Sequence, residues 1–129
     1  MAGTITSNAN TIGRELVTNH RNAIELLVSW VGDASDGTVP SLAVTGYQGW
    51  WITKVVTVPG SVAPTTLYDI TFLDSDGIDL MSGDLLNRSA TLPEEADTAS
   101  QVPYGGFTIA ISNQSVVSAT GTIRVFLNR

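Results

Sequence analysis

Valine, isoleucine and threonine make up 38 of the 129 residues, and this excess most constrains how the chain can fold. β-Branched side chains lose rotamer freedom in helices but pack well on the pleated surface of a sheet. Lysine occurs once, at Lys54, and no stretch combines the alanine, glutamate and lysine residues typical of exposed helices. The chain is therefore predicted to be all-β.

Five segments show the apolar alternation expected of strands that have one buried face. They are residues 23–31, 49–59, 67–73, 106–112 and 120–128. Strict alternation over residues 49–59 predicts that Lys54 shares a face with Ile52 and Val56, whereas Val55 lies on the opposite face. Trp50 and Trp51 are adjacent, so their rings should point to opposite sides, and at least one of them should lie in the core.

Residues 67–80 are predicted to form a β-hairpin whose turn is Asp76-Gly77, because glycine tolerates positive φ and aspartate can bind its own backbone. Ile78 and Leu80 would begin the return strand. Residues 81–105 contain two prolines and two glycines and are predicted to be one long irregular connection. A connection of this length inside a compact domain is usually functional.

Several short strands separated by turns predict an antiparallel β-sandwich, with either a jelly-roll or an immunoglobulin-like topology. The length suits one domain, which we assign to residues 14–129. Residues 1–13 are polar and small, and they are predicted to be an N-terminal arm. This arm is either mobile or ordered on a neighbouring subunit, and the sequence leaves both alternatives open.

Charge and composition argue against several classes of function. The formal net charge is -6, which disfavours nucleic-acid binding because an acidic chain repels phosphate backbones. No apolar run approaches the roughly 20 residues that span a bilayer, so no membrane partner is expected. Cysteine is absent, and no signal-peptide pattern is visible, so folding in a cytoplasm is expected.

Residues that could support catalysis are few. His20, the single histidine, lies in a polar context without the second histidine or the cysteine that a transition-metal site needs. No G-x-S-x-G nucleophile motif is present. We therefore expect no enzyme activity, no catalytic residues, no cofactor and no metal ligands.

Eight acidic residues lie between Asp69 and Asp97, and Arg88 is the only basic residue among them. The closely spaced acids of residues 74–79 suggest calcium, but they fail the EF-hand pattern, which needs glycine at position six and glutamate at position twelve. Gly77 stands at position four and Leu85 at position twelve. A solvated hairpin tip is the favoured interpretation, and calcium binding is left open.

A motif in the middle of the chain resembles a known family. It comprises Ala63-Pro64-Thr65, Tyr68-Asp69-Ile70-Thr71, Asp74-Ser75-Asp76-Gly77-Ile78-Asp79-Leu80 and Asn87-Arg88. These residues are similar to the central signature of small virion-associated structural proteins of tailed bacteriophages. The similarity covers residues 49–89 well, the final strand loosely and the first 45 residues hardly at all. It implies a phage structural protein and supplies no catalytic residues.

Together with the low charge and the absence of cysteine, the resemblance suggests a capsid decoration, or cement, protein that binds the outside of the head and bridges capsid subunits. Its partners would be the major capsid protein and other copies of itself, in a trimer or dimer, and it would reside on the capsid surface of the virion. The alternatives are a tail, neck or spike component, or a carbohydrate-binding module that uses Trp50 or Trp51 with calcium.

Interface residues are predicted in the arm, in the long connection and among the aromatic side chains. They are Thr4, Ile5, Thr6, Arg88, Trp51 and Tyr104. Arg88 has two alternative roles, an ion pair with a partner or local neutralisation of Asp84 or Asp79.

Overall fold

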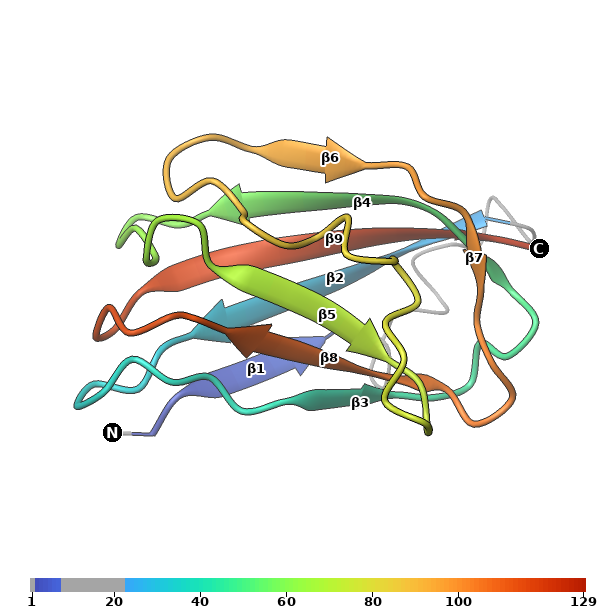
Figure 1. The fold of residues 1–129 in the computed structure, drawn as a ribbon, viewed down its shortest axis with the longest axis horizontal. Coiled ribbons are helices and arrows are strands. Elements are labelled where there is room, and N and C mark those ends of the chain that lie inside the picture. Colours follow the sequence, from blue (N-terminus) through green and yellow to red (C-terminus); the bar gives the residue numbers. More distant parts are fainter. Residues whose placement is uncertain (1, 8–22) are drawn as a thin grey trace.

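The computed structural model describes residues 2–7 and 23–129, and every strand pair within them is antiparallel. Two sheets pack face to face (Figure 1). The larger sheet has the order β1 (Thr4–Ser7), β2 (Ala23–Val31), β9 (Thr120–Asn128), β4 (Trp51–Pro59) and β6 (Glu94–Ala96), with β7 (Ser100–Gln101) also paired to β4. The smaller sheet has the order β3 (Leu42–Val44), β8 (Phe107–Ser112) and β5 (Asp69–Leu73).

This architecture confirms the predicted all-β antiparallel sandwich. Among the residues that the structure describes, none forms a helix long and apolar enough to cross a membrane. His20 lies outside the described residues.

β9 is the central strand of the larger sheet. It pairs with β2 along the whole length of both strands, from Ala23 opposite Asn128 to Val31 opposite Thr120. On its other side it pairs with β4, from Trp51 opposite Asn128 to Pro59 opposite Gly121. The three longest strands therefore form a continuous platform on which the shorter elements are arranged.

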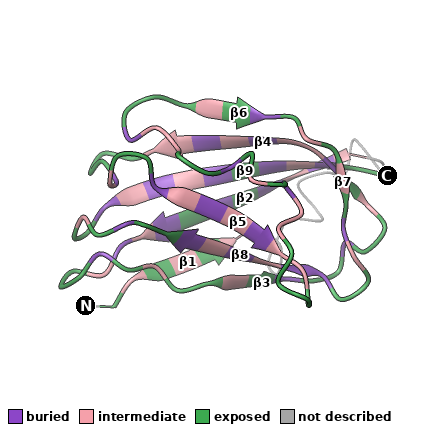
Figure 2. Ribbon diagram, in the orientation of Figure 1, coloured by how far each residue is buried: buried purple, intermediate pink, exposed green. Residues whose placement is uncertain are grey.

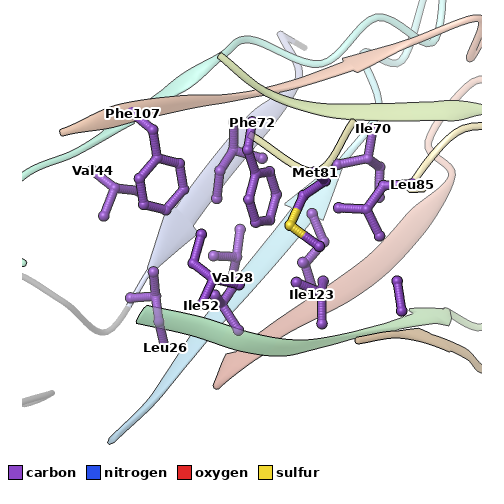
Figure 3. Packing of buried hydrophobic residues seen from close by; sticks show 14 of the residues in the cluster. Leu26, Val28, Val44, Ile52, Ile70, Phe72, Met81, Leu85, Phe107 and Ile123 are labelled. Carbon is purple, nitrogen blue, oxygen red and sulfur yellow. The ribbon is translucent and has the colours of Figure 1, made fainter. Parts of the chain in front are cut away.

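The hydrophobic core lies between the two sheets. Buried and exposed residues alternate along the strands, as the striped colouring of Figure 2 shows. Figure 3 shows side chains of the two sheets meeting. Within the smaller sheet, the ring of Phe72 lies near that of Phe107, and their centroids are 5.1 Å apart. Met81 and Leu85, which belong to no strand, are also fully buried and complete the packing.

The predicted faces of β4 are wrong beyond Ile52, because the strand contains a β-bulge. The register with β9 shifts between Ile52 and Lys54, so that one extra residue is inserted and the alternation inverts. Val55 is consequently buried, whereas Lys54 and Val56 face outward with Trp51.

The predicted hairpin is only partly formed. The turn at Asp76-Gly77 is present, with Gly77 at φ 79°, but beyond it a single bridge joins Leu73 to Asp79 and no return strand follows. The carboxylate of Asp79 accepts hydrogen bonds from the backbone amides of Phe72, Met81 and Gly83. These bonds replace a strand ladder and turn the chain inward.

The long connection is likewise more ordered than predicted. Its first part runs along the free edge of β5, where the amide of Ile70 donates to the carbonyl of Leu85 and that of Arg88 donates to the carbonyl of Tyr68. Its second part contains β6 and β7, which both pair with β4. The connection therefore closes one side of the sandwich.

Gly121 in β9 allows the largest buried side chain to approach the backbone. A Cβ atom at this position would lie 2.6 Å from the Cε2 and Cζ2 atoms of Trp30, closer than real side chains pack. Because the obstacle is a buried ring, which is 1% exposed, it has no room to move away.

We predict that Gly121→Ala lowers the free energy of unfolding by about 1–3 kcal/mol through overpacking. Gly105→Ala is the matched control, because its Cβ would meet no atom within 4 Å and its φ is not in the left-handed region. Urea denaturation of both variants measures the difference. Equal midpoints for the two variants would contradict the packing that we describe.

Candidate interaction surfaces

The two predicted aromatic interface residues are both strongly exposed. Trp51 opens β4 opposite Asn128, and its side chain is 46% exposed. Tyr104 lies beyond β7 and is 90% exposed. Tryptophan and tyrosine are enriched among the residues that contribute most to binding at protein interfaces, so these two are the strongest candidates for an intermolecular contact.

The turn that carries Tyr104 is held by backbone hydrogen bonds. The amide of Gly106 donates to the carbonyl of Pro103 at 2.9 Å, and the amide of Val102 donates to the carbonyl of Trp50 at 2.8 Å. Gly106 has φ 81° and lies so close to the carbonyl of Val44 that no other residue fits there. The exposed ring therefore stands on a fixed base, which lowers the entropy cost of binding.

The neighbouring Trp50 has a different environment from Trp51. It packs against the hydrophobic core, with the ring of Tyr47 edge-on at 6.0 Å. The guanidinium of Arg129 lies 4.9 Å from its ring centroid, a cation–π geometry. The expectation that at least one of the two tryptophans lies in the core is met only in part, because Trp50 is half-buried at the margin of the core and Trp51 is exposed.

The three predicted interface residues near the N-terminus lie in an edge strand. Thr4, Ile5 and Thr6 belong to β1, which is paired with β2 of the same chain. Ile5 packs against the core, and the two threonines are exposed. The first part of the predicted arm is therefore integrated in the larger sheet, while its proposed boundary at residue 13 lies outside the described residues.

Arg88 forms local contacts. Its side chain is only 11% exposed, its Nη2 donates to the carbonyl of Asp84 at 2.9 Å, and its Nε lies 3.8 Å from the Oε1 of Glu94. The local alternative named the carboxylates of Asp84 or Asp79, whereas the carboxylate in range is that of Glu94. The buried geometry favours the local role of Arg88 over a contact with a partner.

Four of the eight carboxylates in the acidic region accept hydrogen bonds from backbone amides. Asp74 accepts from the amides of Asp76 and Ile78 at 2.8 and 2.9 Å, which stabilises the turn. Asp69 binds the amide of Asn87. Within the described part of the chain, no three His, Cys, Asp or Glu side chains are grouped so that they could hold a metal ion.

Tyr68 is fully buried beside Arg88. Its ring contacts that of Trp30, with a centroid distance of 5.7 Å. Burial raises the pKa of its phenol to about 12, an effect that the positive charge of Arg88 opposes and the negative charge of Glu94 reinforces. The neutral phenol is thus the form that the folded protein accommodates.

A face of the molecule that the sequence analysis did not single out is the outward side of the larger sheet, which we call the outer face. It carries Phe126 of β9, with the Lys54 ammonium and the Arg124 guanidinium 5.5 and 5.3 Å from the ring centroid. Each cation also pairs with an acid, Lys54 with Glu95 at 3.1 Å and Arg124 with Glu25 at 2.6 Å. The alternation of residues 120–128 could have predicted this face, because it places Arg124 and Phe126 on the side opposite the buried residues.

One end of the outer face is hollowed. The hollow has a volume of about 440 Å³ and lies where the ends of β2, β9 and β4 meet. Short or apolar side chains and bare backbone line it: Ser29, Trp30, Val31, Val58, Pro59, Gly60, Ser61, Thr120, Gly121 and Thr122.

Comparison with known proteins gives little. No protein-family model matches the chain, and no curated protein matches it. Among solved structures, it is similar to a chain from the Cyanophage Pam1 capsid asymmetric unit, with 14% sequence identity and a TM-score of 0.39. The match covers 98% of this chain and 84% of that chain. A likeness at this level assigns neither a fold family nor a function.

The buried phenol of Tyr68 predicts a pH dependence of stability. Because its pKa is about 12 in the folded protein and about 10 in an unfolded chain, its contribution is complete below about pH 10. It is lost as the pH rises toward 12. Ultraviolet titration should show one tyrosine ionising late, and Tyr68→Phe should remove that step. A wild-type titration that is complete by about pH 11 would contradict the burial of this phenol.

Proposed function

We propose that the protein is a structural component of a tailed-bacteriophage virion, and that it is a capsid decoration protein. In this role it binds the outside of the head and bridges capsid subunits, with the major capsid protein and other copies of itself as partners. It acts by binding rather than by catalysis. It is made in the host cytoplasm and resides on the capsid surface.

The observation that carries the proposal is the spatial arrangement of the motif behind the family resemblance. Its two halves are almost twenty residues apart in sequence, yet they contact each other along the edge of β5. The amide of Arg88 donates to the carbonyl of Tyr68 at 2.7 Å, and the amide of Asn87 donates to the carboxylate of Asp69 at 2.9 Å. Because the two parts of the motif interact, they belong to one structural unit. This supports a relationship to the phage family more strongly than identities scattered over the fold would.

The decoration role is supported by the kind of surface that the sandwich presents. Its charged motif residues are used within the fold, whereas Tyr104 and Trp51 project from fixed positions. Rigid aromatic anchors are typical of binding interfaces. On a shell, many copies bind at once, so a modest affinity of each copy is sufficient.

A tail, neck or spike role would draw on the same fold and differs in copy number. The carbohydrate-binding alternative relied on calcium at residues 74–79. No observation favours it, because Asp74 and Asp79 use their carboxylates to hold backbone amides.

The proposal predicts hundreds of copies of the chain in each virion. Particles of the encoding phage should be purified on a density gradient, and the chain should be counted against the major capsid subunit by quantitative mass spectrometry. A few copies per particle would instead indicate the neck or tail. Absence of the chain from purified particles would refute the virion role altogether.

Two variants should separate binding from folding. Tyr104→Ala should weaken retention on particles at least about tenfold at an unchanged melting temperature, because its side chain is almost wholly exposed. Arg88→Ala should instead lower the free energy of unfolding by about 1–3 kcal/mol, because it removes a largely buried side chain together with its contacts to the Asp84 carbonyl and the Glu94 carboxylate. Leu92→Ala, another exposed apolar truncation, is the control for retention. Normal retention of Tyr104→Ala would exclude this side chain as the anchor.

A further inference from the structure

We propose that two copies of the chain pair back to back through their outer faces, with Trp51 of each copy seated in the hollow of the other. This inference deepens the homo-oligomeric part of the proposed function, because it names the surface, the symmetry and the anchor. It concerns the purified protein in solution and is tested there.

The exposed tryptophan and the hollow lie at opposite ends of the same face. Trp51 is at the start of β4, opposite Asn128 at the end of β9. The hollow is at the other end of the same two strands, where Val58 lies opposite Thr122. The face thus carries a protruding group at one end and a matching recess at the other.

A two-fold axis relates these two ends. We place this axis in the plane between two stacked outer faces, perpendicular to the strands and at the middle of their length. Rotation about it lays each strand over the same strand of the other copy, in the opposite direction. Leu27, Arg124 and Val56 are aligned in register at that middle row. Each Trp51 is then placed over the partner's hollow, twice in one dimer, as an isologous interface requires.

The sizes and chemistry of the two parts agree. A tryptophan side chain buries roughly 150–250 Å² when it is enclosed, and a hollow of about 440 Å³ has room for an indole ring. The walls combine the apolar groups of Val31, Val58 and Pro59 with the hydroxyls of Ser29 and Thr122. At the middle row, Leu27 is 38% exposed and would meet its own counterpart.

The distribution of charge favours a second copy as the occupant of this face. The outer face holds two cations and two acids, which cancel. The other described residues hold nine acidic and two basic side chains, Arg88 and Arg129. The rest of the described chain is thus acidic on balance, whereas this face can be covered by a second copy without long-range repulsion.

The cations do not obstruct the contact. Arg124, which lies on the proposed axis, is bonded to Glu25 through both Nε and Nη2, at 2.8 and 2.6 Å. Lys54 is similarly held by Glu95. Each charge therefore enters the interface already paired, and the apolar ring of Phe126 lies between them.

Sedimentation equilibrium of the purified chain tests the pairing. We expect a dimer for the wild type, and a Kd at least about tenfold weaker for Trp51→Ala, which removes the anchor. Ser29→Trp, which fills the hollow from an exposed position, should weaken association similarly. Tyr104→Ala is the matched control, because it removes an even more exposed aromatic ring outside the outer face, and its Kd should be unchanged.

Mixing the two defective variants gives the decisive result. A heterodimer of Trp51→Ala with Ser29→Trp retains one intact contact, since the second copy still has its tryptophan and the first still has its hollow. Association should therefore recover in the mixture. Melting temperatures verify that the variants fold, and Ser61→Trp replaces Ser29→Trp if the latter is destabilised.

Three outcomes would overturn the pairing. They are a monomeric or trimeric wild type, a wild-type Kd in either variant, and a mixture that associates no better than its components. None of them bears on the virion role, which is decided by the copy number in particles. A monomer that still coats heads would refute the pairing and leave the decoration proposal standing.

Discussion

The two-sided pairing of β9 is the constraint on which the rest of the structure depends. Because β2 and β4 are both hydrogen bonded to it, its alternation sets the orientation of three strands at once. Ile123, Val125 and Leu127 point into the sandwich and fix the position of the smaller sheet. The bare backbone of Gly121 admits the ring of Trp30, the largest side chain in the core. What remains on the other side of β9 is the outer face, which no described strand covers.

Strand identity could be predicted from the sequence wherever one face is buried and the alternation is regular, as in β2, β8 and β9. The bulge in β4 could not, because an extra residue leaves the composition of the segment unchanged while it inverts every later side chain. Lys54 was therefore expected beside Ile52, and only the register with β9 shows that the two lie on opposite sides of the sheet.

The prediction of a complete hairpin was wrong for a different reason. The turn at Asp76-Gly77 was predicted correctly from its two residues. The predicted return strand does not form, because side-chain hydrogen bonds take the place of the strand pairing. The carboxylate of Asp79 accepts hydrogen bonds from three backbone amides. The chain then turns so that Met81 and Leu85 enter the core. Such competition is typical of aspartate near turns, and its outcome depends on tertiary contacts that a single sequence does not contain.

For the candidate site, the sequence selected side chains by their chemistry and could not show where they point. Tyr104 and Trp51 were selected as aromatic residues, and their exposure supports that selection. Arg88 was selected for its charge within an acidic region, and it is buried because Glu94, six residues later, returns to it at the start of β6. A partner brought back by strand pairing is not visible in local spacing.

The acidic excess of the chain has two physical consequences that work together. Inside the fold, aspartate carboxylates such as those of Asp74 and Asp79 stabilise loops by accepting backbone amides. On the surface, the remaining charge repels other copies and leaves the neutral outer face as the favoured approach. Screening by salt weakens this repulsion, so the choice between faces should then rest on shape, that is, on Trp51 and the hollow. In the dimer that we propose, the neutrality of the outer face therefore favours approach at long range, and Trp51 and the hollow provide the contact at short range.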